Sequence, residues 1–212
     1  MPRLLDVGLE QLTALVYRMG EVAEKAINTS INSFVNGKDA TGLELEISDF
    51  LAGMSVEVEN KAFELIAKYQ PVASDLRIIN SYMKIAYDFE RYGRYAWDIS
   101  YTHKKLAGLA KCVKSEDLML ELAQRVSDMV VRSVQALRQH DAELAKNLAI
   151  TEKEVDELFF KYLDQIAKTK AHNRCVMCNL LVSRFLERIA DHTTYVGESI
   201  VYIVSGTKLS LR

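Results

Sequence analysis

Along most of this chain, hydrophobic and polar positions alternate with the period of an α-helix. Near the start, the apolar residues that share this spacing include Leu5, Leu9, Leu12, Val16 and Met19. Steps of three and four positions place them on one helical face. The same pattern resumes after each short break, and no stretch shows the strict alternation typical of a β-strand. The pattern predicts six helices, over about residues 5–36, 40–69, 74–106, 115–139, 141–170 and 173–204.

Residues that end or begin helices stand at the boundaries of these segments. Gly37 and Gly206 can adopt the positive φ that often follows a helix, and Pro71 cannot continue one. Three residues whose side chains can cap a helix N-terminus stand where the third, fourth and fifth helices are expected to begin: Ser74, Ser115 and Asp141. The breaks are short, so consecutive helices are expected to be antiparallel neighbours.

A motif in the first half of the chain returns in the second half. Glu90-Arg91 and Glu187-Arg188 are each followed by an apolar residue and then a small one. The two copies are separated by about half of the 212 residues, which indicates a duplicated structural unit. We therefore predict an all-α fold of two repeated antiparallel three-helix bundles, residues 1–108 and 109–212, with the linker near Gly108.

Two carboxylate pairs in the second half suggest a metal site. Glu152 and Asp156 are four residues apart, as are Glu187 and Asp191, so each pair shares one face of its helix. These two helices are predicted neighbours, and four converging carboxylates suit a hard cation such as iron, manganese, magnesium or calcium. Because the apolar residues of the last helix gather on the opposite side, we expect Glu187 and Asp191 to point outward. The alternative is an ordinary solvated acidic face.

The first copy of the motif differs at one position. Glu90, Arg94 and Asp98 follow one another at intervals of four residues, so opposite charges alternate along one helical face. Arg94 stands where the second copy has Asp191. This degenerate site leads to the hypothesis that the Arg94 guanidinium takes the place of a metal and neutralises Glu90 and Asp98 directly.

Composition narrows the possible functions. The net charge of −2 provides no broad basic surface for nucleic acid, and the chain has no phosphate-binding glycine loop or nucleophile elbow. We therefore expect neither an enzyme nor a nucleic-acid-binding protein. No signal-peptide layout opens the chain and no apolar run is long enough to span a bilayer, so a cytoplasmic location is expected.

The three cysteines do not form a disulfide framework typical of small secreted proteins. Cys175 and Cys178 have the spacing of redox and zinc motifs, with His172 close by. A structural zinc site would need further ligands, and Cys112 alone does not supply them. The two cysteines are therefore expected to be small buried hydrophobic residues of a reduced protein.

Three strings of this chain resemble the PhoU family of phosphate transport regulators. They are Gln-Pro-Val-Ala-Ser-Asp-Leu-Arg at residues 70–77, Asp-Phe-Glu-Arg at 88–91, and Leu-Glu-Arg-Ile-Ala-Asp-His at 186–192. The resemblance covers essentially the whole chain, including the duplication. It implies two three-helix bundles that carry metal clusters on their surface. It also implies a non-enzymatic negative regulator that contacts a phosphate ABC transporter and its sensor kinase, and that meets the membrane only through these partners.

Carried over residue by residue, the resemblance assigns metal binding to the second repeat. Glu152, Asp156, Glu187 and Asp191 match the family's Glu/Asp-x-x-x-Asp motifs. In the first repeat Glu90 matches, but Arg94 replaces an aspartate, and the remaining motif positions fall near two residues without a carboxylate: Ser48 and Ala52. One metal site per chain is therefore expected.

Two further expectations concern association and alternative functions. Six aromatic residues crowd the third helix, where they could pack in the core or form a self-association surface: Tyr82, Tyr87, Tyr92, Tyr95, Trp97 and Tyr101. We expect a homo-oligomer, with a homodimer as its simplest form. One alternative is an adaptor for another transporter. The other, a carboxylate-bridged metallo-oxidase or metal store, is disfavoured because none of the four histidines follows a Glu-x-x-His pattern.

Overall fold

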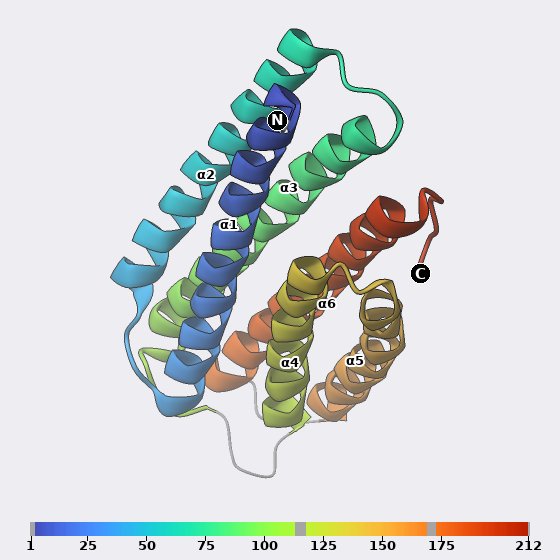
Figure 1. Cartoon of the computed structure of the whole chain (residues 1–212). Helices are drawn as coiled ribbons and strands as arrows, with labels where there is room; N and C mark the ends of the chain where they lie inside the picture. Colours follow the sequence, from blue (N-terminus) through green and yellow to red (C-terminus); the bar gives the residue numbers. More distant parts are fainter. Residues whose placement is uncertain (1–2, 113–117, 169–172, 212) are drawn as a thin grey trace.

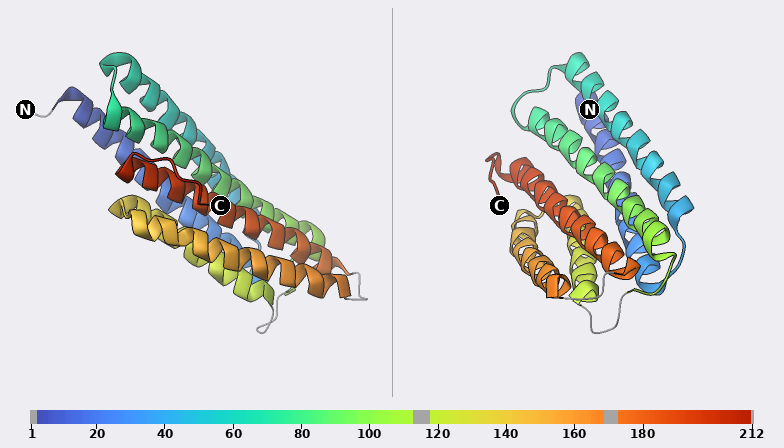
Figure 2. Two further views of the ribbon diagram at one scale, coloured as in Figure 1. Left: turned by 90° about the vertical axis from the view of Figure 1, so that its right-hand side faces the viewer. Right: turned by 180° about the vertical axis from the view of Figure 1, so that it is seen from behind.

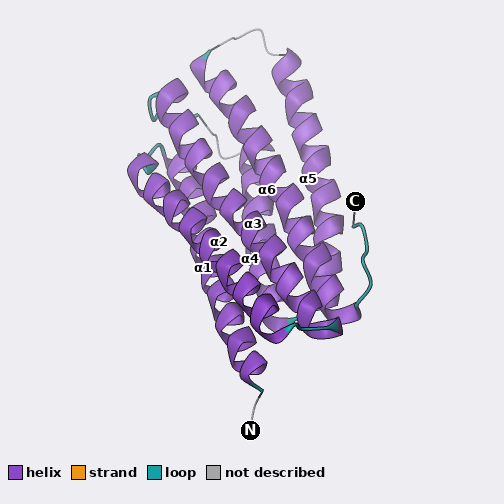
Figure 3. Cartoon of the chain, turned by 90° about the horizontal axis from the view of Figure 1, so that it is seen from above, coloured by secondary structure: helices purple, strands orange, loops and turns teal. Residues whose placement is uncertain are grey.

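The computed structural model describes residues 3–112, 118–168 and 173–211. This part of the chain consists of helices joined by loops and contains no strand (Figure 3). Its elements, in chain order, are α1 Leu4–Asn36, α2 Thr41–Tyr69, α3 Ala73–Thr102, the short π-helix η1 His103–Ala107, α4 Leu118–Gln139, α5 Ala142–Lys168 and α6 Arg174–Ser205. No helix within the described ranges has the length and apolar character needed to cross a membrane.

The helices form two bundles of three that lie side by side (Figure 1). The first bundle contains α1, α2 and α3, and the second contains α4, α5 and α6. The bundles meet where α3 packs along α6 and α1 packs against α4, an arrangement that is also visible from behind (Figure 2). One continuous hydrophobic core runs through both bundles, from Leu12 in α1 to Ile200 in α6. The predicted all-α architecture with six long helices is confirmed.

Most of the predicted helix ends are also confirmed. Gly37 and Gly206 follow α1 and α6 with φ of 69° and 74°, and Gln70 ends α2 in the same left-handed region. Asp141 caps α5, because its Oδ1 accepts hydrogen bonds from the backbone N–H groups of Glu143 and Leu144, both at 2.9 Å. The predicted cap at Ser74 is wrong, since α3 already begins at Ala73. The cap predicted at Ser115 lies outside the described residues.

The last helix, α6, has a central position in the fold. α6 packs against α3 of the first bundle and against both α4 and α5 of its own bundle. Its backbone also approaches α5 closely, since a Cβ added at Gly197 would lie 2.8 Å from the carbonyl oxygen of Ala145. A helix with neighbours on three sides buries residues all around its circumference. The apolar residues that define a core face in the sequence therefore do not leave the opposite face in solvent.

Candidate functional site

The four predicted metal ligands lie on the adjacent antiparallel helices α5 and α6. Gly197 meets Ala145, so in these antiparallel helices the ten residues back along α6 to Glu187 correspond closely to the eleven residues forward along α5 to Asp156. The two side chains interact, because the Asp156 carboxylate raises the pKa of Glu187, although burial is the larger cause of that rise. The structure therefore brings Asp156 of one predicted pair close to Glu187 of the other.

These carboxylates are buried, and the prediction that Glu187 and Asp191 point outward is wrong. The exposed fraction is 9% for Glu187, 1% for Asp191 and 4% for Glu152, while Asp156 is half-buried. The reason is the central position of α6. Packed helices cover its acidic side. The helical period of α6 alone does not show where these neighbouring helices lie.

Two arginines of α6 already supply positive charge at this site. Arg184 Nη1 lies 2.6 Å from Glu187 Oε1, and Arg188 Nη1 lies 2.5 Å from Asp191 Oδ2. Each arginine is three residues before its partner, so one turn of helix is enough to form the pair. The second oxygen of Glu187, Oε2, is buried and has no hydrogen-bond partner. A buried carboxylate oxygen of this kind needs a further donor or a cation.

The donor chemistry of this site suits a hard metal ion, but the side chains are not gathered around one point. Within residues 3–112, 118–168 and 173–211, no group of three or more His, Cys, Asp or Glu side chains stands ready to hold a metal. A buried, half-satisfied Glu187 with Asp156 facing it favours a cation. The pairing of Glu187 and Asp191 with arginines satisfies much of the same need. Metal binding by the four carboxylates thus stays a prediction.

In the first repeat the role proposed for Arg94 stays a prediction. Its guanidinium is exposed and lies over the ring of Trp97, 5.4 Å from the ring centroid. Neither Glu90 nor Asp98 forms an ion pair with it among the described residues. Arg94 still lowers the pKa of Asp98, but burial outweighs it and the pKa of that half-buried carboxyl is raised. Arg94 therefore contacts Trp97 and also acts electrostatically on Asp98.

A buried polar link joins the two repeats, and sequence reasoning did not find it. His192 Nδ1 of α6 lies 2.8 Å from Asp88 Oδ1 of α3, and both side chains are almost fully buried. Three tyrosine rings surround the imidazole: Tyr87, Tyr95 and Tyr195. Burial raises the pKa of Asp88, and the hydrogen bond from His192 opposes that rise. Both residues belong to the repeated motif, and that repetition was the signal available in the sequence.

The crowded aromatic residues of α3 serve mainly as core. Tyr82 and Tyr92 are buried, whereas Tyr87 and Tyr101 keep about half of their surface exposed, at 56% and 43%. A cavity of about 500 Å³ opens beside Tyr87, between α3, α6 and the segment that follows α6. Its wall combines Lys84 with the buried Asp88. The structure contains one chain, so the predicted homodimer is not tested by it.

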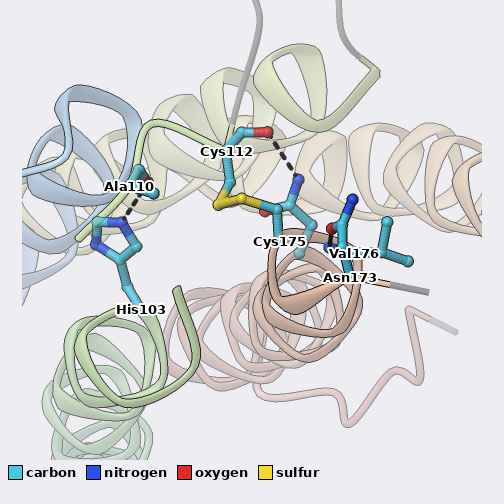
Figure 4. The surroundings of a disulfide bond; sticks show 7 residues. His103, Ala110, Cys112, Asn173, Cys175 and Val176 are labelled. Carbon is cyan, nitrogen blue, oxygen red and sulfur yellow. Dashed lines mark hydrogen bonds between the residues drawn. A yellow bond between two sulfur atoms is a disulfide. The ribbon is translucent and has the colours of Figure 1, made fainter. Parts of the chain in front are cut away.

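The cysteines differ from the expectation of a fully reduced protein. Cys112, in the connection after η1, forms a disulfide with Cys175 in the first turn of α6 (Figure 4). Cys178 is the buried free thiol in the described part of the chain. Cys178 is therefore the small buried residue that the sequence predicts, and Cys175 is not. The spacing of Cys175 and Cys178 suggests a local pair, whereas Cys175 is bonded to Cys112, 63 residues away in the sequence.

Comparison with known proteins identifies relatives along the whole length of the chain. The PhoU domain family model matches residues 16–102 and 119–200. A phosphate-specific transport system accessory protein PhoU homolog from Clostridium acetobutylicum is 31% identical over 219 residues, covering 99% of this chain and 98% of the relative. A protein of the same name from Pseudomonas aeruginosa is 27% identical, covering 95% of this chain and 86% of the relative.

Solved structures show the same arrangement of helices. The crystal structure of PhoU from Pseudomonas aeruginosa matches with a TM-score of 0.85 and 29% identity, covering 95% of this chain and 99% of that one. The phosphate transport system regulatory protein PhoU from Streptococcus pneumoniae matches with a TM-score of 0.86, covering 97% of this chain and 99% of that one. Its 20% identity supports the fold alone.

Proposed function

Because this chain belongs to the PhoU family, we propose that it is a non-enzymatic accessory protein that restrains phosphate uptake through contacts with a phosphate ABC transporter and a sensor kinase. The observation that carries the proposal is the match to a phosphate-specific transport accessory protein over 99% of this chain and 98% of that relative.

The architecture supports a role in transmitting contacts between proteins. Two bundles share one core, and α3 and α6 join them along their length. A structural change caused by a contact on one bundle can therefore be transmitted to the other through packed helices and the buried Asp88–His192 link. The proposal places the protein on the cytoplasmic side of the membrane, where its partners would hold it.

We further propose that the second repeat binds a hard metal ion. Glu152, Asp156, Glu187 and Asp191 would hold it, with Glu187 Oε2 as the buried oxygen that lacks a donor. The ion would supply the positive charge that lets carboxylates of α5 and α6 stay close together. Arg184 and Arg188 hold two of these carboxylates in the structure and would compete with it. The first repeat, with Ser48 and Ala52 at the matching positions, would bind none.

Co-purification tests the proposed function. Affinity-tagged protein, incubated with detergent-solubilised membranes of its source cells, is expected to recover subunits of a phosphate ABC transporter, identified by mass spectrometry. Adding phosphate to the growth medium should raise the recovered amount, because a negative regulator acts when phosphate is plentiful. Recovery of another transporter in place of the phosphate transporter would contradict the phosphate assignment while keeping the adaptor role. A tagged, unrelated helical bundle controls for non-specific capture.

A further inference from the structure

The disulfide between Cys112 and Cys175 lies at a junction of the fold. Cys112 belongs to the connection that leads from the first repeat to the second, and Cys175 is the second residue of α6. The bond therefore ties the connection to the central helix, and α4 and α5 lie within the covalent loop that it closes. Both cysteines are only partly buried, so a small thiol can reach the bond.

The position of Cys175 favours a reactive sulfur. Asn173 caps α6, and its Oδ1 accepts a hydrogen bond of 3.0 Å from the backbone N–H of Val176 (Figure 4). Cys175 thus stands in the first turn, where the free backbone N–H groups and the helix dipole stabilise a negative charge. A thiolate released there leaves more readily than one in an apolar or acidic environment. Cys175 has the surroundings of a good leaving group.

Contacts that do not depend on the bond hold Cys112 beside Cys175. Asn179 Nδ2 donates to the carbonyl oxygen of Cys112 at 3.1 Å, and His103 Nε2 donates to that of Ala110 at 3.0 Å (Figure 4). Arg174 Nη2 donates to the carbonyl oxygen of Lys105 at 3.2 Å. These contacts keep the connection near the start of α6 when the bond opens. The disulfide can therefore re-form without a search through unfolded conformations.

We propose that Cys112 and Cys175 form a reversible redox switch, which locks the connection between the repeats onto α6 when oxidised and leaves it held there only by hydrogen bonds, which open more often, when reduced. Disulfides in reducing compartments are mostly transient or sensory, which fits a bond at an accessible junction. The proposal does not rest on the phosphate function.

The chemistry is thiol–disulfide exchange with a dithiol as the reductant. A thiolate of the dithiol attacks Sγ of Cys112, the Cys112–Cys175 bond breaks, and Cys175 leaves as a thiolate that then takes a proton. The second thiolate of the reductant attacks the mixed disulfide and releases Cys112. Two electrons pass from the dithiol to the cysteine pair, and the dithiol departs as its own disulfide. Oxidation by a disulfide reverses the same steps.

Cys178 serves as an internal reference for this switch. It is fully buried, and burial raises the pKa of its thiol to about 11, so it carries almost no thiolate at neutral pH. Although it is only three residues from Cys175, the buried thiol is a poor nucleophile. We expect it to stay out of the exchange and to react only when the protein unfolds.

Alkylation of the folded, full-length chain tests which sulfurs exchange. The chain is equilibrated with mixtures of reduced and oxidised dithiothreitol, labelled with a maleimide, and mapped by peptide mass spectrometry. Cys112 and Cys175 should become labelled together as the mixture becomes more reducing, while Cys178 stays unlabelled until denaturant is added. The proposal is overturned if Cys112 and Cys175 are labelled in every mixture, or if Cys178 joins the exchange in the folded chain.

Limited proteolysis tests whether the switch changes the connection. Trypsin should cut after the exposed Lys111 about fivefold faster in the reduced protein than in the oxidised one, because the adjoining backbone opens more often. Cys112→Ser should show the fast rate with or without reductant, and Cys178→Ser should respond as the parent does. Cleavage after Arg138, in the last turn of α4, serves as the reference. Equal rates at Lys111 in the two redox states of the parent would overturn the proposal.

Discussion

Glu44→Gln is expected to make the protein more stable at pH 7, by about 3 kcal/mol. Glu44 is a residue of α2 with none of its surface exposed, and neither of its carboxyl oxygens has a hydrogen-bond partner. Burial raises the pKa of this carboxyl from 4.5 to about 8. A neutral amide of almost the same shape avoids the proton uptake that folding otherwise requires.

The direction of this pH effect follows from the number of protons bound in the folded and in the unfolded state. Between pH 4.5 and about 8 the folded chain holds a proton on Glu44 and the unfolded chain does not. The contribution of Glu44 to stability is therefore fully present below pH 4.5 and falls by about 1.4 kcal/mol per pH unit as the pH rises. It stops falling near pH 8, where the folded carboxyl also ionises. The substituted protein lacks this decline.

Urea unfolding at pH 5, 6, 7 and 8 measures this difference. The gap in unfolding free energy between Glu44→Gln and the parent should widen steadily from pH 5 to pH 8. Glu57→Gln, at an exposed position of the same helix, is the matched control and should run parallel to the parent. If the curves of Glu44→Gln and the parent run parallel over this range, the carboxyl is not protonated in the folded state.

His192→Ala is expected to destabilise the protein by about 3–5 kcal/mol, because it leaves Asp88 buried and without its partner. The exposed fractions of Asp88 and His192 are 5% and 4%, and 2.8 Å separates the hydrogen-bonded atoms. The substitution should weaken the packing between the two repeats, since Asp88 comes from α3 and His192 from α6. The removed imidazole also leaves space among the surrounding tyrosine rings, which adds to the effect.

A double-mutant cycle separates the link from the space left behind. His192→Ala, Asp88→Ala and the double variant are unfolded in urea, and the coupling between the two sites should be at least about 2 kcal/mol. Asp128→Ala, which removes an exposed i, i+4 pair with Arg132, is the control and should change stability by less than about 1 kcal/mol. Additive effects of the two single substitutions would show that the link contributes no coupling.

The helices could be predicted because each carries its own signals. Apolar residues at steps of three and four, together with Gly37, Pro71, Asp141 and Gly206, are local features, and the structure keeps them. The burial of Glu187 and Asp191 depends on the helices that pack around α6, which no property of α6 alone reveals. Contacts between residues that are distant in sequence, such as Asp88 with His192, had no signal beyond the repeated motif.

Glu44 could have been found from the sequence. It lies on the same stripe of α2 as the buried residues Ser48, Leu51 and Ser55, so the helical period alone places a glutamate in the core. The Cys112–Cys175 bond could not, because it depends on how the connection between the repeats folds back onto α6. The contact of Arg94 with the ring of Trp97 likewise had no signal in the charge pattern of α3.

The second repeat, and not the first, is proposed to bind a metal ion. Purified protein is incubated with iron or manganese, passed through a desalting column, and its metal content is measured by elemental analysis. We expect bound metal in the parent and in a Glu90→Gln, Asp98→Asn double variant, and none in a Glu187→Gln, Asp191→Asn double variant. Metal retained after the second pair of substitutions, or lost after the first pair, would contradict the account.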